Sequence, residues 1–259
     1  MKKQNKKPYF ESWYFREQAA DFTCAFTVRI DYDEKGKMKG GLMIELPCGR
    51  WRLDYAHPVN MNLRDSLFIV LGKSVFTEAC VHLDVDEPGL SIKGDIYFEE
   101  EWGKARVGLR RKIWAMEQAL SGEISVNGKR VVFDGGKGYL ESVRNAVSDW
   151  PKRQFWTQCN WFGERPFRIV CGGYGRHCFA FIDQDGYPVR MAGWKGAKVE
   201  YMCGGNFRMS QGRYLLEGWR STEGKSDCLN QTVRYRLTHG DDILFDEISK
   251  RAVYRYEVK

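Results

Sequence analysis

Three side chains that could bind a ligand alternate along one short stretch, Trp156, Gln158 and Asn160. If residues 154–162 form a strand, these three share one face, because successive side chains of a strand point to opposite faces. The other face then carries Phe155, Thr157, Cys159 and Trp161. An indole with two amides on one side and apolar groups on the other predicts the wall of a ligand-binding barrel. The alternative is that both amides pair with buried backbone groups at the barrel mouth.

A second stretch, residues 9–16, also places a reactive group among aromatic ones. As a strand it carries Glu11, Trp13 and Phe15 on one side. A carboxylate between two aromatic side chains is an unusual choice for a solvent-exposed face.

The elements around these stretches are predicted to be strands. Residues 22–32 alternate apolar and polar side chains with a period of two, and so do residues 75–85. Asn127-Gly128 is a strong signal for a two-residue hairpin. Turns recur every 8–12 residues or so, which is typical of a meander or a barrel. We expect at most one short helix, near 141–149 or 65–67, and there is no glycine-rich phosphate loop.

Composition favours two small barrels over one large one. The 259 residues include nine Trp and 27 Gly but only seven Pro, so aromatic strands broken by glycine turns predict an all-β protein. The most charged stretch lies at residues 99–112, and we place the passage between two domains there, giving 1–112 and 113–259. A Trp beside polar groups opens each half, which suggests duplication.

Charge and cysteine content exclude several functions. The net charge is +7, with 41 basic residues spread thinly, so no nucleic-acid partner is expected and attraction to anionic lipid is more plausible. The eight cysteines and four histidines show no metal-ligand spacing, so free buried thiols and no metal site are expected. No apolar segment indicates export or an integral membrane span, which predicts a cytoplasmic protein.

The same stretches resemble the tocopherol cyclase family, whose bacterial members open with YFEGWYFK and carry GxxxxFxGGxGYxE followed by WxQCN. The opening here is YFESWYFR at residues 9–16. The central match comprises Gly128, Phe133, Gly135, Gly136, Gly138, Tyr139, Glu141, Trp156, Gln158, Cys159 and Asn160. Phe245, Asp246, Ala252, Tyr254 and Tyr256 resemble the closing strands, so the similarity spans nearly the whole chain.

This resemblance implies an all-β fold of two tandem lipocalin-like, calycin-type antiparallel β-barrels with few short helices. It also implies cofactor-independent chemistry, in which an acid protonates a prenyl double bond and a phenol oxygen captures the cation. The expected function is therefore intramolecular cyclisation, an isomerase or intramolecular lyase reaction, of a prenylated hydroquinone or similar apolar substrate.

Ring closure of this type needs a proton donor in an apolar wall, where desolvation favours the neutral acid. Glu141 is the first candidate and Glu11 the second, although either could be a structural carboxylate paired with an arginine. Rings that could stabilise the cation belong to Trp13, Tyr14, Tyr139 and Trp156, which would otherwise be core aromatics. Gln158 and Asn160 would hold the substrate oxygen.

The chain also departs from the family pattern. Gln118 stands where the family has a histidine, Ser12 stands for a glycine, and residues 142–150 form a longer, different loop. These changes favour a rival function, a non-catalytic carrier of a small hydrophobic ligand. A third possibility is a protein-interaction module with a filled barrel.

Overall fold

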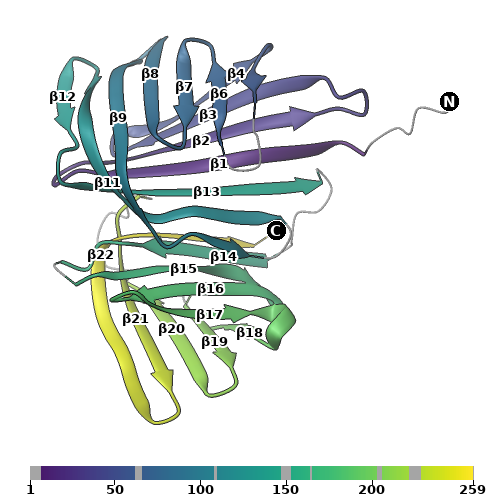
Figure 1. Ribbon diagram of the computed structural model, residues 1–259, viewed down its shortest axis with the longest axis vertical. Coiled ribbons are helices and arrows are strands. Elements are labelled where there is room, and N and C mark those ends of the chain that lie inside the picture. The colour runs from purple at the N-terminus through teal and green to yellow at the C-terminus, as the bar shows by residue number, and fades with distance from the viewer. Residues whose placement is uncertain are drawn as a thin grey trace. The chain divides into compact units, whose positions relative to one another are not determined.

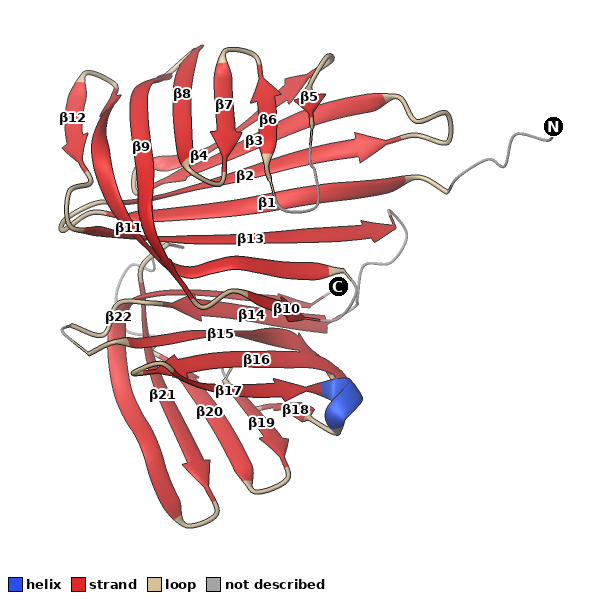
Figure 2. Cartoon of the chain, viewed as in Figure 1, coloured by secondary structure: helices blue, strands red, loops and turns tan. Residues whose placement is uncertain are grey.

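The structure is a computed structural model that describes residues 7–61, 66–107, 110–146, 153–163, 165–202, 206–221 and 229–258. The chain divides into two compact units, Met1–Asp149 and Trp150–Lys259. Both are built from antiparallel strands, as Figures 1 and 2 show. The predicted all-β fold class is thereby confirmed.

The first unit is one sheet of 13 strands. The hydrogen-bonded order is β4-β3-β2-β1-β13-β11-β9-β8-β7-β6-β5, with β10 and β12 both paired to β11. The strands are β1 (Tyr9–Gln18), β2 (Thr23–Tyr32), β3 (Met38–Leu46), β4 (Gly49–Tyr55), β5 (Val59–Asn60), β6 (Phe68–Leu71), β7 (Ser74–Thr77), β8 (Cys80–Glu87), β9 (Leu90–Trp102), β10 (Ala105–Val107), β11 (Arg111–Val126), β12 (Lys129–Val132) and β13 (Gly136–Ala146).

The sheet of the first unit curls around an apolar core. Alternate residues of β1 and β2 enter it, Trp13 and Phe15 from one strand and Phe26 and Val28 from the other. The ring of Phe15 lies against that of Phe76, with centroids 5.6 Å apart. The period-two pattern of residues 22–32 therefore reports the inner face of β2, as predicted.

The second unit is a nine-stranded sheet in the order β17-β16-β15-β14-β22-β21-β20-β19-β18. Its strands are β14 (Arg153–Cys159), β15 (Phe167–Tyr174), β16 (His177–Gln184), β17 (Tyr187–Ala192), β18 (Lys198–Tyr201), β19 (Phe207–Gln211), β20 (Tyr214–Arg220), β21 (Gln231–His239) and β22 (Asp242–Val258). A 3-10 turn, η1 (Gly193–Lys195), joins β17 to β18.

The core of the second unit receives Phe155 and Cys159 from β14. Thr157, between them, hydrogen-bonds Tyr235 and donates to the carbonyl oxygen of Val253 at 2.8 Å. The face of β14 predicted to be packed is therefore the inner face of this sheet.

The division between the units differs from the boundary expected at 112/113. Strands β11 and β13 pair with β9 and β1, so residues 111–146 complete the first sheet instead of opening the second. The helix expected near 141–149 is likewise a strand as far as Ala146. The rest of the loop that departs from the family pattern, from residue 147 onward, lies outside the described residues.

Candidate functional site

The strongest candidate for acid chemistry is Glu17, near the end of β1. Its side chain is completely buried, and neither carboxyl oxygen has a hydrogen-bond partner among the described residues. Burial raises the pKa of this carboxyl well above its usual value, and the neighbouring Arg16 only partly opposes the effect. Burial therefore favours the neutral form of the Glu17 carboxyl over its ionised form.

A glycine leaves the space that the Glu17 carboxyl occupies. Gly138 on β13 lies directly opposite Glu17. A Cβ atom at Gly138 would come within 2.5 Å of Oε2 of Glu17 and within 2.8 Å of Cδ2 of Leu120. No larger residue fits here unless the acid moves.

Beside Glu17, residues of four neighbouring strands form a row across the sheet. Glu17 faces Gly138, Gly138 faces Gln118 on β11, and Gln118 faces Glu101 on β9. The Gln118 amide nitrogen lies 3.4 Å from Oε1 of Glu101, whereas its Oε1 is buried without a partner among the described residues. Glu101 is partly exposed and pairs with Lys104. The row thus runs from a buried acid to a solvated carboxylate.

Sequence reasoning missed Glu17 because it ended the first strand too early. Glu17 continues the alternation of Glu11, Trp13 and Phe15, and β1 extends to Gln18. Carrying the period-two pattern two residues further would have placed Glu17 on the same face as Trp13 and Phe15, although not its burial against β13.

The structure gives Glu141 a different environment from the one expected. Nη1 of Arg111 lies 2.6 and 2.5 Å from its two carboxyl oxygens, and the Tyr139 hydroxyl donates to Oε2 at 2.8 Å. An ion pair of this kind is the structural role that was weighed as the alternative to catalysis. Glu141 is buried, and its carboxyl has Arg111 and Tyr139 as hydrogen-bond partners.

The remaining candidates of the first unit lie on two faces of the same strands. Trp13 shares the inner face with Glu17, and its indole nitrogen has no partner among the described residues. Tyr14 and Tyr139 lie on the opposite face with Glu141, their ring centroids 6.3 Å apart. The sequence analysis placed Trp13, Tyr14 and Tyr139 in one site, but the sheet has Trp13 on one face and the two tyrosines on the other.

Glu11, the second predicted acid, lies on the inner face near the start of β1. Its Oε2 accepts from the Asn60 amide at 3.2 Å and from the Tyr32 hydroxyl at 3.4 Å, and Arg144 lies 3.6 Å from Oε1. Burial, with Glu11 nearby, raises the pKa of Tyr32 to about 12. Glu11 thus has donors on several sides, in contrast to Glu17.

Trp156, Gln158 and Asn160 belong to the second unit; the first two alternate with the core residues of β14, and Asn160 directly follows the strand, which ends at Cys159. Gln158 and Asn160 are buried, and the guanidinium of Arg255 lies 5.7 Å from the Trp156 ring. Binding of a ligand by these three residues stays a prediction.

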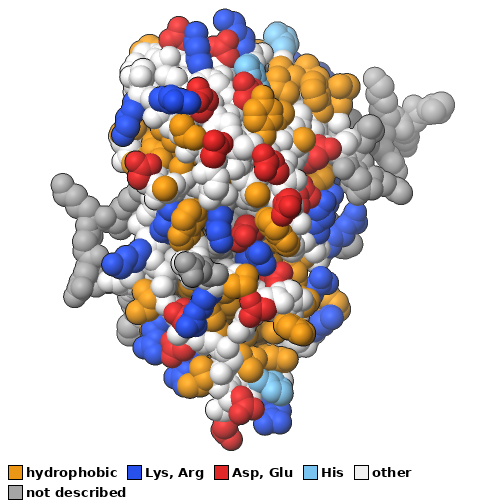
Figure 3. Space-filling model, turned by 60° about the vertical axis from the view of Figure 1, so that its left-hand side comes forward, with side chains coloured by type: hydrophobic (Ala, Val, Ile, Leu, Met, Phe, Trp, Pro, Cys, Tyr) orange, Lys and Arg blue, Asp and Glu red, His pale blue; other side chains and the backbone are white. Residues whose placement is uncertain are grey.

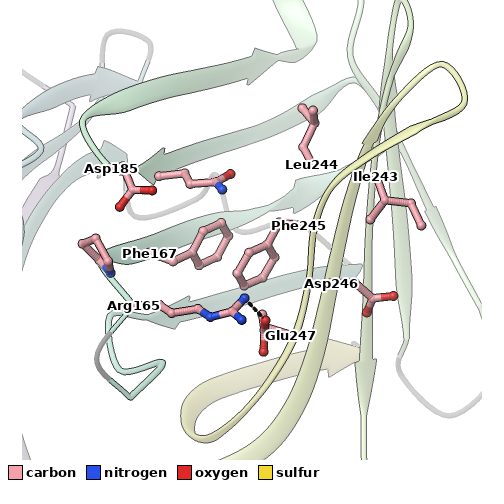
Figure 4. Close-up of a pocket in the computed structure, with 10 residues that line it drawn as sticks. Arg165, Phe167, Asp185, Ile243, Leu244, Phe245, Asp246 and Glu247 are labelled. Atoms are coloured by element: carbon pink, nitrogen blue, oxygen red, sulfur yellow. Dashed lines mark hydrogen bonds and ion pairs between the residues drawn. The ribbon is translucent and has the colours of Figure 1, made fainter.

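Two hollows of about 440 Å³ each lie on the described surface. The one in Figure 4 is walled by β22 and the residues around Phe167, with Phe167 stacked on Phe245 and Arg165 paired with Glu247. The other lies over β9 and β11. Neither is lined by any of the predicted site residues or by Glu17.

No protein-family model and no curated protein matches this chain. Solved structures do resemble it. CghA in complex with Sch210972 superposes with a TM-score of 0.59 at 12% identity, covering 97% of this chain and 89% of CghA. Kievitone hydratase from Nectria haematococca gives 0.53 at 9% identity, over 98% of this chain and 89% of the hydratase. A putative AttH from Nitrosomonas europaea gives 0.50 at 9% identity, over 96% and 91%. The chain therefore has the fold of these proteins, an all-β fold of two tandem lipocalin-like sheets.

Proposed function

We propose that this protein is a cofactor-independent acid catalyst of the tocopherol cyclase type, which closes a ring in a prenylated hydroquinone or a similar apolar substrate. The proposal is supported by the buried carboxyl of Glu17 on the inner face of the first unit, which has no hydrogen-bond partner among the described residues and whose pKa is raised by burial. An acid that keeps its proton near neutral pH is the group that alkene protonation requires.

The reaction is an isomerisation whose atoms balance within the substrate and Glu17. The Glu17 proton adds to one carbon of the prenyl double bond, which forms a C–H bond and leaves a tertiary cation. A phenol oxygen then forms the C–O bond of the new ring and loses its proton, which restores the carboxyl of Glu17. No external oxidant, reductant or water is consumed.

The hydrogen-bonding groups beside Glu17 fit a hydroxyl-bearing substrate. Buried polar groups are normally paired, yet Oε1 of Gln118 has no donor among the described residues. Gln118 lies next to Gly138, which in turn faces Glu17. A phenol hydroxyl would supply that donor. Trp13, on the same face, offers a ring surface to a cation, an interaction of about 0.5–2 kcal/mol.

The other predicted residues take secondary roles in this proposal. Glu11 is a second acid on the inner face, already supplied with donors. Glu141 joins β13 to β11 through Arg111, together with Tyr139. Binding of substrate by Tyr14, Tyr139, Trp156, Gln158 and Asn160 stays a prediction from the family resemblance.

The test is turnover of a prenylated hydroquinone in D₂O. We expect a product of altered retention time that carries one deuterium on carbon for each ring closed, and loss of this product in Glu17→Gln. Glu123→Gln, an exposed change on β11, is the matched control and should remain active. Turnover that survives in Glu17→Gln would remove Glu17 from the mechanism.

The rival function, a non-catalytic carrier, is favoured by the complete burial of Glu17, which substrate reaches only if neighbouring side chains move. The same assay decides between them. A carrier returns the hydroquinone unchanged and free of carbon-bound deuterium, although it retains the molecule on the protein.

A further inference from the structure

Two stretches separated in the chain meet at one end of the second unit. One is the turn between β15 and β16, with His177 at the start of β16, and the other is the 3-10 turn η1 with the strand β18 that follows it. The Val199 amide donates to the carbonyl oxygen of Gly175 at 3.1 Å. Gly193 of η1, the blue segment in Figure 2, packs so closely on the carbonyl of Arg176 that any Cβ would overlap it. We call residues 175–177 and 193–198 the basic tip.

The basic tip presents a large aromatic side chain to solvent. Trp194 is 74% exposed, one of the two most exposed large hydrophobic side chains described. The ammonium of Lys195 lies 4.8 Å from its ring. Trp194 therefore offers an exposed aromatic surface, with a cation beside it, to any partner that contacts this end of the unit.

The positive charges of the basic tip are uncompensated. Arg176, Lys195 and Lys198 are all exposed, and none forms an ion pair with a described residue. Three other exposed arginines of the same unit are paired, Arg165 with Glu247, Arg208 with Glu217 and Arg234 with Asp246, whereas Arg190 and Arg213 form no ion pair with a described residue. The nearest acidic residue on β18, Glu200, lies across from Arg208.

The charge of the whole chain is concentrated in this unit. Residues 150–259 hold 18 Lys and Arg against 12 Asp and Glu, a net charge of +6, whereas residues 1–149 hold 23 against 22. The basic tip therefore places three exposed cations without an ion pair to a described residue in the unit that carries most of the net charge.

We propose that the basic tip docks on the surface of an anionic phospholipid bilayer. Tryptophan prefers the interface between headgroups and acyl chains, and basic side chains near an anionic leaflet add affinity one by one. A single exposed indole with Lys195 beside its ring, and with Arg176 and Lys198 in the same basic tip, matches that environment. A nucleic-acid strand would instead call for several ring platforms along a groove. The proposal is independent of the function proposed for Glu17.

The test is co-sedimentation of the full chain with vesicles. We expect binding to vesicles of phosphatidylcholine with phosphatidylserine, little binding to phosphatidylcholine alone, and weakening as salt is raised. Trp194→Ala should reduce binding. The double variant Lys195→Glu, Lys198→Glu should weaken vesicle binding by about fivefold for each positive charge lost. Binding should weaken further because each lysine is replaced by a negatively charged side chain.

Matched controls lie in the first unit. Trp102→Ala removes another exposed indole, and Lys35→Glu with Lys37→Glu makes the same charge change on an exposed turn. Both should bind vesicles as the unchanged chain does, and circular dichroism melts should show that every variant folds. The proposal is overturned if no variant of the basic tip binds less than its control. It is equally overturned if the unchanged chain ignores anionic vesicles, or binds a single-stranded oligonucleotide through the basic tip instead.

Discussion

A buried carboxyl without a hydrogen-bond donor costs free energy in any protein, and Glu17 is such a group. The cost falls mainly on the ionised form, so the folded chain keeps the proton that the unfolded chain gives up. The absence of a side chain at Gly138 leaves the space that the Glu17 carboxyl fills.

Stability should fall with rising pH because of Glu17. Its folded-state pKa is raised, so its contribution is complete below the unfolded pKa of about 4.3 and is lost as pH rises towards the folded value. The free energy of unfolding should decline by up to about 1.4 kcal/mol per pH unit relative to Glu17→Gln. Urea titrations of both chains from pH 4 to 8 measure this. Parallel curves would show that Glu17 titrates normally.

Gly138→Ala should destabilise the first unit through Glu17. The new methyl group would meet Oε2 of the acid, a crowding that typically costs about 1–3 kcal/mol. In a Glu17→Ala background most of this cost should disappear, which a double-mutant cycle detects. An equal cost in both backgrounds would mean that Leu120 or the backbone, and not the acid, defines the space.

Glu141→Gln should lower the stability of the first unit without removing turnover. It removes the charged partner of Arg111, so we expect a loss of about 1–3 kcal/mol in stability. Turnover of the prenylated hydroquinone per folded molecule should be kept, because the proposed proton donor is Glu17. Denaturant unfolding and the deuterium assay measure the two effects, and loss of turnover in a stable variant would restore Glu141 as the acid.

At the scale of elements, individual strands were predictable and their partners were not. The alternation in residues 22–32 and the Asn127-Gly128 hairpin are local signals, and both are realised in β2 and in the β11–β12 turn. The pairing of β1 with β13 joins residues more than a hundred positions apart, which no local pattern encodes. Because that pairing was missed, so were the domain boundary and the face shared by Glu17, Gly138 and Gln118.

The two possible boundaries predict opposite behaviour for fragments. A chain of residues 1–112 lacks most of β11 and all of β13, so β1 and β9 would present unpaired edges. We expect it to aggregate, whereas residues 1–149 should form a folded monomer. Size-exclusion chromatography with circular dichroism distinguishes them, and a stable, monomeric 1–112 fragment would contradict the structure.

At the scale of the whole molecule, the sequence predicted fold class from composition and family resemblance, and the likeness to solved structures bears it out. The chemistry was less accessible, because Glu141 fits the family motif while Glu17 shows its environment only once the sheet is assembled. The positions of charged side chains without an ion-pair partner could not be predicted from the sequence either. On the face in Figure 3 acidic and basic side chains are interspersed, and only the structure reveals where cations lack partners.

Infrared difference spectroscopy of the unchanged chain against Glu17→Gln at pH 7 detects whether the first unit holds a neutral carboxylic acid. We expect a protonated-carboxyl C=O band that is present in the unchanged chain and absent from the variant. A difference spectrum with only ionised-carboxylate bands would contradict it.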